Sequence, residues 1–175
     1  MKRLTVAVLA TALAAVGTAS AKVRATSLAG FVVEHEVVLP GGPEEIYDTV
    51  TGDIKPWWDH HLSESPRSLT IEARPGGSFK EIFDESGDGA IHATVIYAHR
   101  GKRLRFAGPL GFSGYPLELV VTYDLEPHEK GTLMKVTCSA AGQVEAGWDQ
   151  AIDQVWHHFL FEALKPYVES RSRKE

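Results

Sequence analysis

The sequence predicts an α+β domain in which a curved antiparallel β-sheet of about seven strands wraps around a long C-terminal α-helix, with short helical structure after the first strand. Two observations carry this prediction. Six short strand-like runs follow one another between residues 68 and 139 with only turns between them. After Gly142, apolar residues recur at three- and four-residue steps, as in an amphipathic helix. A twisted sheet of this size curls, and the final helix is the element long and apolar enough to cover its concave face.

The first 21 residues have the three-part pattern of a secretory signal peptide. Lys2 and Arg3 precede an apolar run over residues 4–16, and small residues at 19–21 favour cleavage after Ala21. The apolar run is shorter than the roughly 20 residues that span a bilayer. We therefore expect a periplasmic or secreted protein with no stable membrane insertion after cleavage.

The remaining 154 residues suit one ordinary domain, which we assign to residues 22–169. They carry 16 Lys and Arg against 23 Asp and Glu, a net charge of −7 that argues against a nucleic-acid partner. Cys138 is the single cysteine, so no internal disulfide can form. Its strand-like surroundings predict a buried, inert thiol.

The first predicted strand covers residues 31–39, a β-branched run that ends at the Pro and Gly residues of 40–42. A short helix should begin at Pro43, because proline is favoured at the first helical position. Glu44 and Glu45 suit the positive end of its dipole.

The central strands are expected to form an antiparallel meander, because parallel neighbours need long crossover connections that these turns do not provide. The predicted strands are residues 68–72, 78–83, 91–97, 103–106, 117–125 and 133–139. The connection over residues 107–116 is rich in Gly and Pro yet apolar, and it suits either a mobile flap or an ordinary wide hairpin loop.

The final helix is predicted from Glu145 to Lys165, and Pro166 should end or kink it. Residues 170–175 form a charged tail that we expect to fray. His157 and His158 follow Trp156 on this helix, so at most one of them can face the core, and we expect both to be exposed to solvent.

Several motifs taken in order resemble the START-like, helix-grip superfamily, also called SRPBCC. They are Trp57-Trp58-Asp59, the segment 74–81 (Arg-Pro-Gly-Gly-Ser-Phe-Lys-Glu), the segment 102–106 (Lys-Arg-Leu-Arg-Phe), Gly131-Thr132 and the Trp-rich final helix. The resemblance covers about residues 31–167. It implies the helix-grip fold and a cavity between sheet and helix. It implies no single reaction, because the superfamily includes polyketide cyclases, lipid-transfer proteins, plant allergens and activators of a heat-shock ATPase.

The candidate site gathers titratable groups near this cavity. Glu81 shares a strand face with Phe79 and Phe83, so its carboxylate should point where apolar side chains point. His92 lies across the following turn, where it can pair with Glu81. The pair, joined by His61, suits ligand anchoring by hydrogen bonds, acid–base catalysis by Glu81 and His92, or a metal held by all three residues.

The leading hypothesis is a protein that binds a small apolar or amphipathic molecule. The predicted ligand-binding residues are Trp57, Trp58, His61, Phe79, Glu81, Phe83, His92, Phe106, Tyr115, Trp148 and Trp156. The alternatives are a cyclase or dehydratase and a chaperone-interaction module, the latter disfavoured by the predicted export. No cofactor is expected, because Gly76-Gly77 lacks a following helix to hold a phosphate and residues 84–95 lack the final Glu of a calcium loop.

Overall fold

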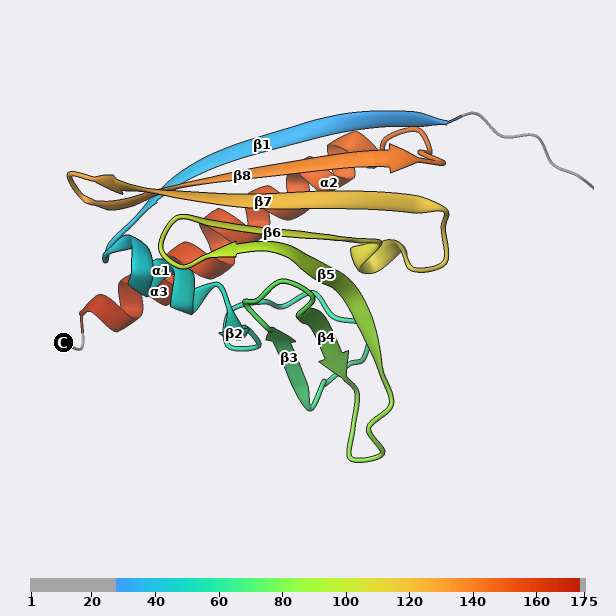
Figure 1. The fold of residues 1–175 in the computed structure, drawn as a ribbon, viewed down its shortest axis with the longest axis horizontal. Helices are drawn as coiled ribbons and strands as arrows, with labels where there is room; N and C mark the ends of the chain where they lie inside the picture. Colours follow the sequence, from blue (N-terminus) through green and yellow to red (C-terminus); the bar gives the residue numbers. More distant parts are fainter. Residues whose placement is uncertain (1–27, 174–175) are drawn as a thin grey trace, which may run out of the picture.

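The computed structural model describes residues 28–173 and contains an eight-stranded antiparallel sheet (Figure 1). The predicted signal peptide, with its cleavage after Ala21, and the last two residues of the predicted tail lie outside these described residues. The strands run in the order β1-β8-β7-β6-β5-β4-β3-β2. Their bounds are β1 Ala29–Leu39, β2 Gly52–Asp53, β3 Ser68–Ile71, β4 Ser78–Ile82, β5 Gly89–His99, β6 Arg103–Gly108, β7 Leu117–His128 and β8 Gly131–Gly142.

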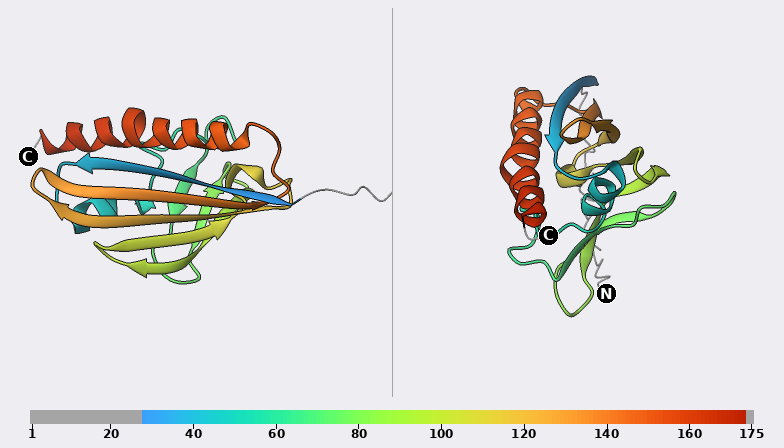
Figure 2. Two further views of the ribbon diagram at one scale, coloured as in Figure 1. Left: turned by 90° about the horizontal axis from the view of Figure 1, so that it is seen from above. Right: turned by 90° about the vertical axis from the view of Figure 1, so that its left-hand side faces the viewer.

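The helices comprise α1 (Pro43–Thr49), the short 3-10 turn η1 (Leu110–Phe112) and one long C-terminal helix. The long helix has three parts: α2 (Trp148–His157), the π-helical segment η2 (His158–Leu164) and α3 (Lys165–Ser172). It lies along one side of the sheet, whose strands curl about it (Figure 2). The predicted helix-grip architecture is confirmed, with the two-residue strand β2 added to the seven predicted strands.

Strand β5 carries two register irregularities, one in its pairing with each neighbouring strand. One lies between Phe79 and Lys80 where β4 pairs with β5, and the other between Val95 and Tyr97 where β5 pairs with β6. Bulges of this kind bend a strand and increase its twist. In Figure 1, β3, β4 and the adjoining part of β5 turn away from the layer formed by β1, β8 and β7. The bend opens space between this part of the sheet and the helix.

The C-terminal helix differs from its prediction at both ends. It begins at Trp148 instead of Glu145, because Gly147 adopts a left-handed conformation with φ of 85°. It also continues past Pro166 to Ser172, where the sequence predicted an end or a kink. The Lys165 N–H donates to the carbonyl of Leu160, the wider π-helical register, and Pro166 occupies the first turn of α3, where a missing N–H costs little.

The interior between sheet and helix is apolar, and Cys138 is part of it. Its thiol is fully buried, and this burial raises the pKa of Cys138 to about 11, which fits the inert thiol expected from the sequence. Among residues 28–173, no helix combines the length and apolar character that crossing a membrane requires.

Candidate functional site

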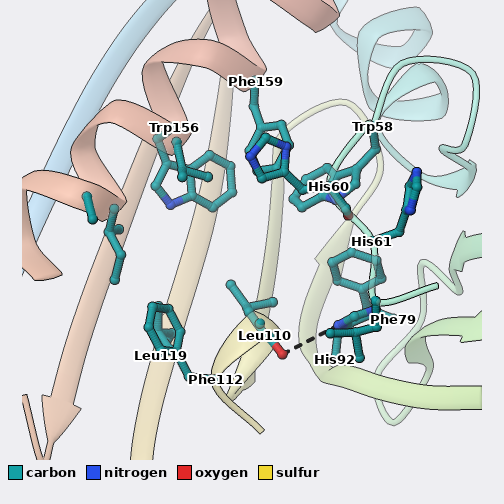
Figure 3. Close-up of a pocket in the computed structure, with 15 residues that line it drawn as sticks. Trp58, His60, His61, Phe79, His92, Leu110, Phe112, Leu119, Trp156 and Phe159 are labelled. Atoms are coloured by element: carbon teal, nitrogen blue, oxygen red, sulfur yellow. Dashed lines mark hydrogen bonds between the residues drawn. The ribbon is translucent and has the colours of Figure 1, made fainter. Parts of the chain in front are cut away.

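A cavity of about 300 Å³ lies between the bent part of the sheet and the first half of the long helix (Figure 3). Its wall is mostly apolar and aromatic, with histidines from two elements. The lining residues are Trp58, His60, His61, Leu62, Phe79, His92, Leu110, Gly111, Phe112, Leu119, Ala151, Ile152, Val155, Trp156 and Phe159. The volume lies at the lower end of the roughly 300–1,000 Å³ that small-molecule sites occupy.

Trp58 organises the aromatic wall of the cavity. Its ring stacks on Phe159 at 4.0 Å and meets Phe79 edge-on at 5.3 Å, so it joins the helix to the sheet. The indole N–H donates to the carbonyl of His60 at 2.8 Å, which satisfies the polar end of a 6% exposed side chain. This fixed tryptophan offers a flat apolar surface to a ligand.

Glu81 is a fully buried carboxylate that ties the loop before β3 to β5. It accepts hydrogen bonds from the backbone N–H groups of Leu62 (2.9 Å) and Ser63 (2.8 Å), from the Ser63 hydroxyl (3.0 Å) and from His92 Nε2 (3.0 Å). Burial opposes ionisation, but these donors outweigh it and hold the pKa of Glu81 below its ordinary value. Glu81 is therefore ionised at neutral pH and does not line the cavity, so its role is to position His92 and the loop.

His92 is the polar group at the inner wall of the cavity, 6% exposed. Its Nε2 faces Glu81 at 3.0 Å, and its Nδ1 faces the carbonyl of Leu110 at 3.4 Å (Figure 3). A neutral imidazole has one N–H, and the shorter contact with the carboxylate takes it. The His92 ring is thus held at the cavity wall between the Glu81 carboxylate and the Leu110 carbonyl.

The mouth of the cavity lies between three exposed segments. His60 and His61 belong to the loop before β3, Gly111 to the η1 turn, and Ala151 to the first half of the helix, and all four are exposed. Leu110, beside Gly111, is the sole non-glycine residue with positive φ (49°) within residues 28–173. The strained turn aims its carbonyl at His92.

The structure brings five of the predicted ligand-binding residues to the cavity wall. These residues are Trp58, His61, Phe79, His92 and Trp156. The Glu81 to His92 contact expected from the sequence is also present, although Glu81 stands behind His92.

The remaining predicted residues do not line the cavity. The Trp57 indole turns into the core and donates to the carbonyl of Thr49 at 3.0 Å. Phe106 is fully buried, with its ring 5.9 Å from Phe79 and 5.5 Å from Tyr123. Phe83 lies past the end of β4, where its backbone N–H donates a hydrogen bond to the carbonyl of Asp88 across the turn.

Tyr115 and Trp148 also lie outside the cavity wall, with ring centroids 5.0 Å apart. Both pack on Phe112, whose own ring does line the cavity. They therefore support the turn that carries Phe112 without reaching the cavity themselves.

Sequence reasoning missed the residues that loops and the helix contribute. The sequence pattern placed four of them on the inner faces of a strand and a helix, namely Leu119, Ile152, Val155 and Phe159. Periodicity does not show which part of such a face borders a cavity. Leu110 and Phe112 come from the 107–116 connection, whose apolar residues were the available signal.

His61, Glu81 and His92 do not form the alternative metal site, because the Glu81 carboxylate already accepts hydrogen bonds from Leu62, Ser63 and His92. Within residues 28–173, the possible metal-ligating side chains that converge are instead those of Asp59, His60 and His158, whose donor atoms lie within 4.8 Å of one another.

Comparison with known proteins places the chain by sequence and by shape. The model of the family described as "Activator of Hsp90 ATPase homolog 1-like protein" matches residues 42–169. No curated protein matches the chain significantly in sequence.

Solved structures with the same fold come from several bacteria. An uncharacterized protein from Rhizobium leguminosarum aligns with a TM-score of 0.63 at 18% identity, covering 82% of this chain and 97% of its own. A protein of unknown function from Staphylococcus aureus aligns with a TM-score of 0.61 at 14% identity, covering 83% of this chain and 98% of its own. At these identities the likeness shows the fold.

Proposed function

We propose that this chain, which belongs to the family of Activator of Hsp90 ATPase homolog 1-like proteins, binds a small apolar or amphipathic molecule between its sheet and its C-terminal helix. The family is part of the START-like SRPBCC superfamily, so the resemblance drawn from the sequence is confirmed. The family's name does not assign the activity, because one fold carries many functions.

The observation that carries the proposal is the lining of the cavity. Trp58, Phe79, Leu119, Trp156 and Phe159 surround the space, and all five are buried. A ligand that buries about 200 Å² of apolar surface there would gain about 5 kcal/mol from the hydrophobic effect, before the cost of association. That gain suits a compact ligand held with moderate affinity.

The polar groups set how such a ligand would lie. His61 and His92 stand on the same side of the cavity as Trp58 and Phe79, opposite Leu119 (Figure 3). A polar group on the ligand would lie beside His61 and His92, while the apolar part would fill the space towards Trp156 and Ile152. The bound molecule would therefore be amphipathic, with its polar end at the strand side.

The test is titration with an anilinonaphthalene sulfonate dye, whose fluorescence rises in apolar surroundings. We expect saturable binding to the unaltered chain and loss of at least tenfold in affinity for Val155→Trp, which fills the cavity from the helix. Val32→Trp is the matched control, because Val32 is 62% exposed on β1 and distant from the cavity. Equal dye binding by both variants would contradict the proposal.

A second function is favoured by the Glu81 to His92 contact, namely acid–base catalysis on the bound molecule. The His92 imidazole would take a proton from the substrate, and the Glu81 carboxylate would stabilise the imidazolium that forms. The two functions separate when a molecule extracted from the protein is incubated with fresh protein and analysed by NMR. An unchanged spectrum supports binding alone, and a conversion abolished by His92→Gln supports catalysis.

A further inference from the structure

A cluster of two histidines and two carboxylates joins the long helix to the loop at the cavity mouth. One oxygen of Asp59 lies 2.9 Å from His60 Nδ1, and the other lies 2.7 Å from His158 Nε2. Glu162, one helical turn after His158, contacts His158 Nδ1 at 3.0 Å. The four residues come from two segments about 100 positions apart, and none of the roles described above uses the contacts between them.

The two contacts of His158 require a positive charge on or beside its ring. Both of its nitrogens face carboxylate oxygens, which are acceptors, and a neutral imidazole can donate to only one of them. If Nδ1 donates to Glu162, the lone pair of Nε2 points at Asp59, and the contact is favourable only with a positive ion between them. Either a second proton or a metal ion meets this requirement.

The composition and geometry of the cluster suit a metal ion. Two imidazoles and a carboxylate are a common ligand set for zinc and related divalent ions. The three donor atoms lie within 4.8 Å of one another, and ligand atoms on a tetrahedral zinc ion lie roughly 3.3 Å apart, as bond lengths of 2.0–2.2 Å require. The Asp59 and His60 side chains are about half exposed and that of His158 is 33% exposed, so small rotations suffice and an ion can enter from solvent.

The environment of His158 adds a second feature of metal sites. Histidines that bind metals usually donate their other N–H to a carboxylate, which fixes the ring and the tautomer. Glu162 stands in that position. His158 is also the first residue of the π-helical segment η2, and π-helical turns are frequent at functional sites.

We propose that Asp59, His60 and His158 bind one divalent transition-metal ion of the zinc type at the rim of the cavity, with Glu162 orienting His158. The three protein ligands leave a coordination position for water or for an anionic group. Because His60 also lines the cavity, the ion would pin the mouth loop to the helix beside the opening. The site is independent of the ligand-binding proposal, since the ion alone would occupy it.

The experiment is calorimetric titration of the full chain, purified without an affinity tag and stripped with chelator, with Zn²⁺ alone. We expect saturation at one ion per chain and a rise in the melting temperature on binding, because the ion binds the folded state. His158→Ala and His60→Ala should each weaken binding at least tenfold, and Glu162→Gln by about tenfold. Co²⁺ in place of Zn²⁺ should give visible absorption bands that His158→Ala removes.

His99→Ala is the matched control, because His99 is an exposed histidine at the end of β5 and lies outside the cluster. It should bind Zn²⁺ like the unaltered chain. Circular dichroism of each variant checks that the fold is retained. Absence of saturable binding, or binding that survives both His60→Ala and His158→Ala, would overturn the proposal and leave a proton between His158 and Asp59.

Discussion

The two halves of the long helix face the same sheet, yet one covers a void and the other a filled core. In the first half, Ile152, Val155, Trp156 and Phe159 border the cavity. In the second half, Leu160, Leu164 and Val168 are buried at 4% exposure or less and border no part of it. The π-helical segment lies where one half gives way to the other.

Both halves of the helix carry buried apolar residues, so the two ends differ mainly in what faces the helix. At the filled end, α1 packs against the sheet (Figure 1). Ile46 and Val50 are fully buried there. At the hollow end, the two irregularities of β5 bend the sheet. The cavity lies between this bent part of the sheet and the first half of the helix.

The largest effect should come from truncating a leucine at the filled end. Leu164→Ala should cost about 4 kcal/mol of the free energy of unfolding, because it leaves a new void in packed surroundings. Leu119→Ala, at the hollow end, should cost about 2 kcal/mol, because part of that side chain already borders a cavity. Urea denaturation measures both values. Equal costs would break the comparison between the two ends.

A smaller effect is expected at the polar wall of the hollow end. Glu81→Gln should cost about 2 kcal/mol, because hydrogen bonds to a charged group are lost and an amide N–H₂ then faces backbone donors. Glu85→Gln is the control, since Glu85 is 86% exposed in the same hairpin and should change stability by under about 0.5 kcal/mol. A loss of the same size in both variants would contradict the positioning role of Glu81.

Acid should expose the same contribution without any substitution. Since the pKa of Glu81 is lower in the folded than in the unfolded chain, the unfolded chain binds more protons at acid pH. The contribution is complete above the ordinary Glu pKa of about 4.3 and is lost as the pH falls through the folded-state value. Urea denaturation across this range should show a shallower decline for Glu81→Gln than for the unaltered chain.

The smallest effect is expected at Pro166, in the second half of the helix. Pro166→Ala should change the free energy of unfolding by under about 1 kcal/mol, far from the roughly 3 kcal/mol that proline costs inside an α-helix. The reason is that Pro166 lies in the first turn of α3, directly after the π-helical segment. A gain of several kcal/mol on substitution would show that the proline strains the helix.

The sequence sufficed for most of the fold because its elements are encoded locally. Alternating apolar residues between Pro and Gly turns identified seven of the eight strands, and three- and four-residue steps identified the long helix. Strand β2 was missed because two residues carry no period. The start at Trp148 was missed because the left-handed Gly147 gave no signal distinct from any other glycine.

The site was predicted less completely, because it depends on contacts between distant segments. Strand alternation predicted that Phe79 and Glu81 share the inner face, where both are buried, and the short turn between the strands predicted the contact of His92 with Glu81. The same reasoning could not show that Trp57 turns to the carbonyl of Thr49 while its neighbour Trp58 faces the cavity. Nor could it show that His158 meets Asp59, 99 residues away.

The lone thiol of Cys138 gives the molecule a built-in reporter. It lies on β8 between Val33 of β1 and Val121 of β7 and contacts Trp156 of the helix, so reagents in solution reach it only when the helix lifts from the sheet or the strands separate. The rate of labelling by a disulfide reagent would therefore report how often this interior opens. A molecule bound in the cavity would lower that rate if it holds the strands against the helix.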